Sequence, residues 1–240
     1  MLHQYSGRTD RRSRAPALPA DKQKPAGPND RPRPAGTGPA VGGYVPGNSV
    51  RRFADGTAMR LPAGYSLVFQ MHYTTYGKAT TDRSKVALKF ATTKPQIVLN
   101  TATLINGSLD IPPQAANHQV DAELTINREV MLYSLVPHTH VRGKRWHYEA
   151  IYPDGRREVL LSVPKYDFNW QHEYVFSQPL RMPAGTKIHA TAWYDNSPAN
   201  KSNPDPTNHV LWGDQTWEEM MYTSIAYFLP PAPTSAARQH

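Results

Sequence analysis

From residue 61 onward, apolar and polar residues alternate in short runs that Pro, Gly, Asn and Asp interrupt. The stretch YSLVFQMHY at 65–73 sends Leu67, Phe69 and Met71 to one face of an extended chain and His72 to the other. No stretch sustains a 3.6-residue period, so the pattern predicts an all-β protein with antiparallel sheets. Strands are expected at 65–73, 86–90, 120–126 and 129–140, with a hairpin at 148–161 that turns at Pro153-Asp154-Gly155.

A weak internal repeat indicates how many domains to expect. LPAGYSLVFQMHY at 61–73 and MPAGTKIHATAWY at 182–194 share a Pro-Ala-Gly turn, an alternating run and a closing tyrosine. We therefore predict tandem antiparallel β-sandwich domains of jelly-roll type, the first of them incomplete. The expected parts are a basic Pro/Gly-rich segment at 1–45, a remnant of the first domain at 46–83, the second sandwich at 84–230 and a tail at 231–240.

Most of the net positive charge of the chain lies in its first 60 residues. The net charge is +8, and residues 1–60 hold 11 Lys and Arg against 4 Asp and Glu. Segment 1–45 is also rich in Pro and Gly, a composition typical of disordered or loosely held chain. It has no interleaved aromatic residues and no recognisable nucleic-acid-binding module, so no nucleic-acid partner is expected.

The composition excludes several classes of site. The chain has no cysteine, which removes thiolate zinc sites, iron–sulfur clusters and a cysteine nucleophile. A metal ion would have to be bound by His, Met, Asp or Glu. No apolar run is long enough to span a membrane, and the first residues lack the apolar stretch of a signal peptide.

Two histidines stand out at the end of an expected strand. His138 and His140 follow Pro137 in the run EVMLYSLVPHTH. Residues i and i+2 of a strand point to the same face, so both imidazoles can converge on a single metal ion. We favour a metal site here over two structural histidines.

The sequence leaves the third ligand open. Met220 and Met221 would by default fill a core, because methionine packs easily into apolar gaps. His72 alone fits a cleft residue as well as a ligand. If a methionine joins the histidines, imidazole and thioether together favour copper, particularly Cu(I), whereas zinc prefers a carboxylate or a third histidine.

Other enzyme classes fit the motifs less well. A cupin also uses His-x-His, but it needs a glutamate four or five residues later, and the next one here is Glu149. No Gly-x-Ser-x-Gly elbow and no phosphate-binding glycine loop is present. A cupin-type mononuclear metal enzyme remains an alternative.

Three motifs together carry a family resemblance. LVFQMHY, PHTHVRGK and WGDQTWEEMM occur in the order and at the spacing of the copper type II ascorbate-dependent monooxygenases. That family includes the peptidylglycine α-hydroxylating and dopamine β-monooxygenases, and the chain is most similar to its bacterial branch through PHTHVRGK, YEAIYPDGRREVLL and DFNWQ. The resemblance covers about residues 43–230.

The resemblance implies a site and an activity. Family members have two consecutive sandwiches with one copper each, and ascorbate supplies the electrons. The second copper binds O2, and its ligands correspond to His138, His140 and Met220. His72 matches the third histidine of the first, electron-donor copper. The implied reaction is hydroxylation of a C–H bond in a small-molecule substrate by an exported, periplasmic or secreted enzyme.

The chain departs from the family at three points. It has no adjacent His-His pair, so the electron-donor site is expected to be incomplete, with a missing upstream domain as one explanation. Val136 and Ser224 occupy the positions where the peptide-amidating members carry an arginine and a tyrosine. A peptidylglycine substrate is therefore not expected, and a non-catalytic copper-binding or interaction sandwich is the main alternative.

Overall fold

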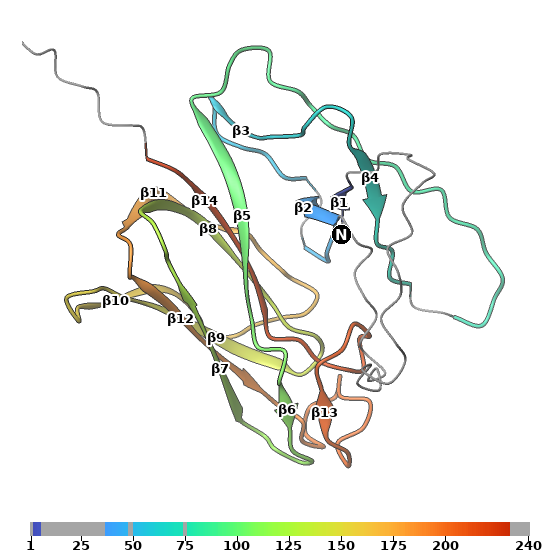
Figure 1. The fold of residues 1–240 in the computed structure, drawn as a ribbon. Helices are drawn as coiled ribbons and strands as arrows, with labels where there is room; N and C mark the ends of the chain where they lie inside the picture. Colours follow the sequence, from blue (N-terminus) through green and yellow to red (C-terminus); the bar gives the residue numbers. More distant parts are fainter. Residues whose placement is uncertain (1, 6–36, 48–49, 74–75, 231–240) are drawn as a thin grey trace, which may run out of the picture.

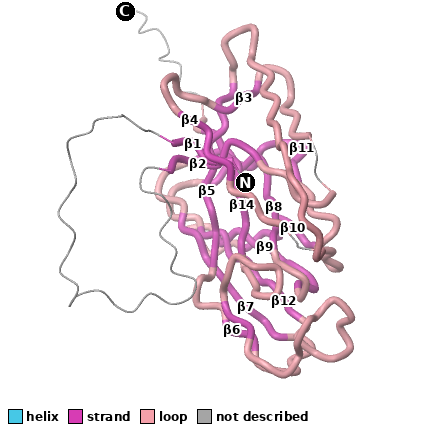
Figure 2. Tube along the Cα trace, turned by 90° about the vertical axis from the view of Figure 1, so that its right-hand side faces the viewer, coloured by secondary structure: helices cyan, strands magenta, loops and turns pink. Residues whose placement is uncertain are grey.

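The computed structural model describes residues 2–5, 37–47, 50–73 and 76–230, and within them the chain forms strands and loops without a helix (Figure 2). None of these residues forms a helix long and apolar enough to cross a membrane. The strands are β1 (Leu2–Tyr5), β2 (Thr37–Gly42), β3 (Thr57–Met59), β4 (Ser66–Phe69), β5 (Ile97–Ile105), β6 (Asp110–Ile111), β7 (His118–Thr125), β8 (Val130–His138), β9 (Gly143–Ile151), β10 (Arg157–Val163), β11 (Tyr174–Met182), β12 (Lys187–Tyr194), β13 (Val210–Leu211) and β14 (Tyr222–Phe228).

Two sheets make up the main body, in the order β10-β9-β12-β7 and β11-β8-β14-β5-β3 (Figure 1). All their pairs are antiparallel except β3 with β5. The predicted all-β sandwich class is thereby confirmed. A short pair, β13 with β6, lies at one end of the sandwich.

The core lies between the two sheets, because alternate residues of their strands point inward. On β9, Trp146, Tyr148 and Ala150 are buried and the residues between them are partly exposed. The Tyr148 hydroxyl lies 2.7 Å from Oγ1 of Thr223 on β14, so one hydrogen bond crosses the core. Fully burying one such large side chain contributes about 1.5–3 kcal/mol.

The chain before residue 96 is built differently. β1, β2 and β4 form a separate three-stranded sheet in the order β2-β1-β4, beside the five-stranded sheet. β1 and β2 fall inside segment 1–45, for which the sequence predicts disorder or loose attachment, and residues 6–36 of that segment lie outside the described residues. β3 pairs with β5, so residues 57–59 belong to the sheet of the large sandwich.

Some of the predicted strands form where expected, and others are shorter or do not form. β7, β8 and the β9–β10 hairpin lie where the alternation placed them, and Gly155 in the hairpin turn has a φ of 85°. The expected strand at 65–73 is shorter, because β4 covers Ser66–Phe69. The strand expected at 86–90 is wrong: these described residues form no strand, and Phe90 is 70% exposed.

Candidate metal centre

His138 is the last residue of β8, and His140 follows two positions later. Their rings are close, with centroids 5.2 Å apart and planes at 80° to each other. The turn that follows is tight, because a Cβ added at Gly143 would lie 2.7 Å from Cβ of Thr139. The structure thus brings together the two histidines that the His-x-His spacing singled out.

The His138 ring is held by a glutamine from a distant loop. Its Nδ1 lies 2.7 Å from Oε1 of Gln171, and Nε2 of the same amide donates to the Phe168 carbonyl at 2.8 Å. The second bond fixes the orientation of the amide, so Oε1 faces the imidazole and accepts its Nδ1 proton. His138 therefore keeps the Nε2 lone pair for a metal ion.

The His140 ring is oriented in the same way by a backbone group. Its Nδ1 lies 3.1 Å from the Glu218 carbonyl oxygen, which only accepts, so Nδ1 carries the proton. The Phe168 ring packs edge-on against the imidazole at 6.3 Å, and His140 is 5% exposed. Both histidines thus present Nε2 as the free nitrogen.

A buried carboxylate ties the histidine turn to the loop before β14. Glu219 is fully buried and accepts the backbone N–H groups of His140 and Arg142 at 2.7 Å each, and that of Met220 at 3.1 Å. Burial raises the pKa of the Glu219 carboxyl to about 7, although these three hydrogen bonds lower it. The His140 and Met220 N–H groups share Oε2, so their backbones lie side by side.

Arg142 braces the same turn from its buried side. Its Nε donates to Oδ1 of Asn196 at 3.1 Å and its Nη1 to the Trp217 carbonyl at 2.9 Å. Asn196 is itself fully buried, and its Nδ2 donates to the Pro112 carbonyl. The histidine turn, the 195–208 loop and the loop before β14 are therefore joined by side chains.

The two adjacent methionines have different surroundings. Tyr222 pairs with His138 in the antiparallel register of β14 and β8, and continuing that register places Met220 opposite His140. Met221 is fully buried in the core cluster, whereas Met220 is partly exposed. Continuing the alternation of β14 back by two residues would put Met220 on the side of Tyr222, whose ring centroid lies 6.1 Å from that of His138.

His72 lies beyond the end of β4 and is exposed. Its charge acts on the other two histidines: burial, the charge of His140 and the charge of His72 lower the pKa of His138 to about 4. Burial and, to a smaller extent, the charge of His72 also lower the pKa of His140. Among the described residues, no three His, Asp or Glu side chains are arranged to hold a metal ion, so His72 is not a third ligand of the pair in this structure.

The donor set of this turn fits copper. Two neutral imidazoles present free Nε2 atoms, and a thioether residue, Met220, stands two residues before β14, the strand that pairs with β8. This is a soft donor set without carboxylates. Sequence reasoning missed Gln171 and Glu219, although both stand in motifs that it used, DFNWQ and WGDQTWEEMM. Two other residues of the DFNWQ motif contact each other, because the Asn169 backbone N–H donates to Oδ1 of Asp167 at 2.8 Å.

A family model described as "Copper type II ascorbate-dependent monooxygenase, C-terminal domain" matches residues 96–239. The chain belongs to this family. The matched residues include every strand from β5 to β14, so the large sandwich apart from β3 corresponds to the C-terminal domain of the copper type II ascorbate-dependent monooxygenases. The resemblance stated from the motifs is thereby confirmed at the level of the family.

Other comparisons add little. No curated protein matches the chain. Among solved structures, a chain of infectious bursal disease virus, Gx strain, matches with 11% identity and a TM-score of 0.30, covering 63% of this chain and 38% of the viral one. A Gt strain chain matches with 12% identity and a TM-score of 0.28, covering 69% and 41%. The chain thus spans about two fifths of each viral chain, and likenesses this distant bear on neither fold nor function.

Proposed function

We propose that this chain binds one copper ion through His138, His140 and Met220, as the oxygen-binding half of an ascorbate-dependent monooxygenase. The observation that carries the proposal is that hydrogen bonds at both Nδ1 atoms leave the two Nε2 atoms free on neighbouring rings. Bound copper would supply O2 activation for hydroxylation of a substrate C–H bond. The family description supports the same chemistry.

The protein's own groups have defined parts in this proposal. Gln171 and the Glu218 carbonyl hold the imidazoles in the tautomer that a metal ligand needs. Glu219 holds the backbone of His140 beside that of Met220. A thioether is a soft ligand, so Met220 would favour Cu(I), the oxidation state that reacts with O2.

A copper titration tests the proposal directly. The purified chain should bind one copper ion tightly, with a Cu(II) EPR spectrum that shows nitrogen ligands. His138→Ala should abolish tight binding, because it removes one of the two imidazoles. His209→Ala is the control, since the side chain of His209 is 58% exposed and paired with Asp110 near β13. Equal copper binding by all three proteins would contradict the proposal.

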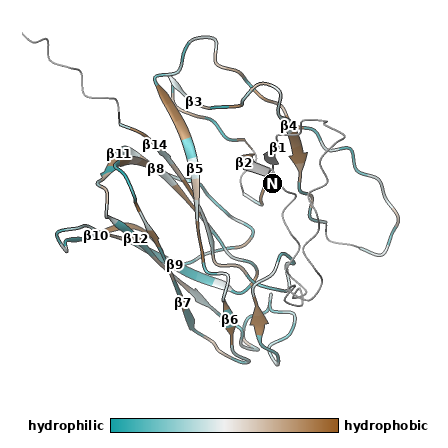
Figure 3. Ribbon diagram, viewed as in Figure 1, coloured by the Kyte–Doolittle hydropathy of each residue, from teal (hydrophilic) through white to brown (hydrophobic). Residues whose placement is uncertain are grey.

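We also propose that the electron-donor half needs residues from another domain or chain. The sequence has no His-His pair, and His72 is the one residue that matches that site. Apolar side chains near it are uncovered: Phe69 is 43% exposed, Met71 44% and Tyr73 64%. β4 accordingly stands out as hydrophobic in Figure 3. Exposed apolar residues in such number are typical of a surface that another protein segment covers.

A copper-binding sandwich without turnover is the second candidate function, and the missing His-His pair favours it. The two functions differ in one measurement. A complete enzyme consumes ascorbate and O2 in proportion to a hydroxylated product, whereas a copper-binding sandwich forms none. We expect this chain alone to hydroxylate no substrate, or to do so very slowly.

A further inference from the structure

The loop that holds His138 is itself held by chain from the far N-terminal side. We call residues 46–47 and 50–59 the strap. The Pro46 carbonyl accepts the backbone N–H of Gln171 at 2.9 Å. The same Gln171 orients the His138 imidazole through its side chain. Two hydrogen bonds, both made by Gln171, therefore link the strap to His138.

Gly47 makes this contact possible. Its φ is 87°, in the left-handed region that side chains rarely adopt. A Cβ added there would lie 2.9 Å from the Trp170 Cα and 3.1 Å from the Gln171 backbone nitrogen. Any larger residue would have to displace the backbone of the loop at the residue that holds His138.

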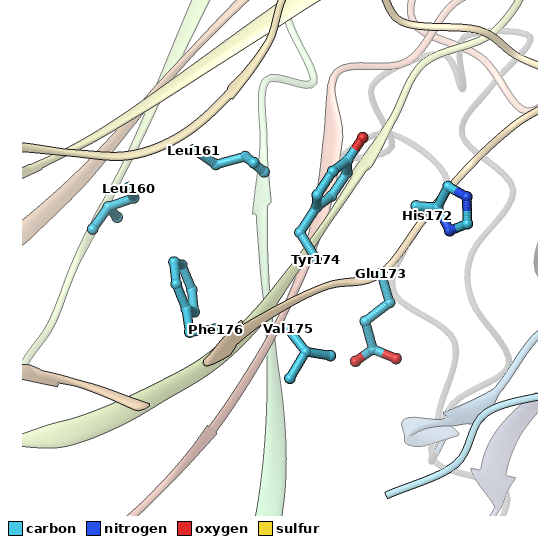
Figure 4. A pocket seen from close by; sticks show the side chains of 7 residues that line it. All are labelled: Leu160, Leu161, His172, Glu173, Tyr174, Val175 and Phe176. Atoms are coloured by element: carbon cyan, nitrogen blue, oxygen red, sulfur yellow. The ribbon is translucent and has the colours of Figure 1, made fainter. Parts of the chain in front are cut away.

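A second contact fixes the loop two residues further on. Arg51 binds the Glu173 carboxylate with two nitrogens, Nη2 at 2.7 Å and Nε at 3.0 Å. The Ser134 hydroxyl of β8 donates to the same carboxylate at 2.6 Å. In Figure 4 the side chains of Glu173 and Tyr174 point to opposite sides of the chain. Glu173 thus joins the strap to the strand that ends in His138.

The strap is also fixed to the sandwich away from this loop. β3 pairs in parallel with β5. Phe53 and Met59 pack against a small buried cluster of Leu99, Tyr133 and Ala226. The strap is therefore part of the packed body of the C-terminal domain and has a firm base from which to hold the loop.

We infer that the strap is a positioning element of the metal centre, which holds the 170–173 loop so that Gln171 directs Nε2 of His138 toward the metal ion. The inference rests on the proposed copper site. It extends the set of residues that position this site to Pro46, upstream of the family match at 96–239. Gly47 and Arg51 act through Gln171 and Glu173 and are positioning residues.

The decisive variant is Gly47→Ala, with Gly155→Ala as its matched control. Gly155 also has a positive φ, 85°, but an added Cβ there meets no atom within 4 Å. Both variants carry the same kind of backbone strain, and Gly47→Ala alone disturbs the loop. Losing an outer partner of a metal-ligating histidine typically costs 10–100-fold in metal affinity. We expect Gly47→Ala to lower copper affinity about tenfold or more and to change the Cu(II) EPR spectrum, and Gly155→Ala to change neither.

A measurement without copper separates this inference from the proposed function. Nitrogen-15 NMR of the metal-free protein reports which nitrogen of His138 carries the proton. The full chain should show the Nδ1-protonated form, and Gly47→Ala and Gln171→Ala should both admit the Nε2-protonated form. If the full chain fails to bind copper, the proposed site is wrong, and the tautomer shift still decides whether the strap positions His138.

A double-mutant cycle tests whether the strap acts through Gln171. Adding Gly47→Ala to Gln171→Ala should cost no further copper affinity, because the bond that the strap supports is already absent. If Gly47→Ala does not fold, Arg51→Gln replaces it and should cause the same tautomer shift. A strap variant that lowers the unfolding temperature but leaves the His138 tautomer and the EPR spectrum unchanged would show a merely structural strap and overturn the inference.

Discussion

Met220 and Met221 are neighbours of the same type, and the structure predicts opposite consequences for their replacement by alanine. Met221 is fully buried in the core cluster of the sandwich. Met220 is partly exposed and lies opposite His140 in the extended register of β14 and β8. Met221→Ala should therefore destabilise the fold and spare copper binding, whereas Met220→Ala should weaken copper binding and largely spare the fold.

The size of the stability effect follows from burial. Replacing a buried methionine by alanine costs about 2–5 kcal/mol of unfolding free energy, and full burial of Met221 places it within that range. In a domain of this size each kcal/mol lowers the unfolding temperature by about 2–4 °C. Met221→Ala should thus lower that temperature by roughly 4–20 °C, and Met220→Ala by clearly less.

Two assays test the two alanine substitutions: thermal unfolding of the metal-free protein, and competition titration with a Cu(I) chelator. Leucine substitutions serve as controls of volume, because such swaps usually cost under about 1.5 kcal/mol. Met220→Leu should weaken Cu(I) more than Cu(II), since it removes a soft ligand without leaving a void. If Met221→Leu weakens Cu(I) and Met220→Leu does not, the two methionines have exchanged roles and the assignment of Met220 is refuted.

Three further predictions concern polar groups. Glu219→Gln should lower the unfolding free energy by about 1–3 kcal/mol in urea titrations, because the amide nitrogen cannot accept a backbone N–H such as that of Arg142; unchanged stability would contradict this. Tyr148→Phe leaves Oγ1 of Thr223 without its buried partner and should cost about 1 kcal/mol, whereas a gain in stability would not be expected. Burial raises the pKa of Asp121, but hydrogen bonds and a neighbouring histidine outweigh it and lower that pKa below its unfolded value. This carboxylate therefore adds stability that is present above about pH 4 and is lost as the pH falls through its native pKa. In Asp121→Asn, the unfolding free energy should fall less steeply as the pH is lowered.

Local patterns were enough to place the elements that carry the histidines. Alternation predicted β7 and β8, and the Pro153-Asp154-Gly155 turn predicted the hairpin of β9 and β10. Alternation also predicted a strand at 86–90, where none forms. An alternating run becomes a strand only where another strand can pair with its backbone, and in the described residues none pairs with 86–90. Sequence alone shows the pattern and leaves the partner unspecified.

The groups around the histidines were out of reach for a different reason. Gln171 is 33 residues from His138, and Glu219 is 79 residues from His140. No local spacing encodes such contacts, because they arise only when β8, β11 and β14 are side by side in one sheet. The two histidines were found because strand geometry links residues two apart, and Met220 became a candidate only through the family resemblance. Their supports were missed because tertiary packing alone brings them near.

The separation between the proposed ligands and the groups that orient them bears on how the site binds its metal. The groups that orient the two imidazoles, Gln171 and the Glu218 carbonyl, lie outside the proposed ligand set, so their hydrogen bonds exist before any metal arrives. Rotamer and tautomer are then already selected in the metal-free chain, and binding need not order either ring at a cost in conformational entropy. His72 follows a four-residue strand and is exposed, and it has no comparable support among the described residues. A histidine without such support would have to be ordered by whatever completes its own site, and this difference is the reason for proposing that the sandwich binds copper and that a larger assembly donates the electron.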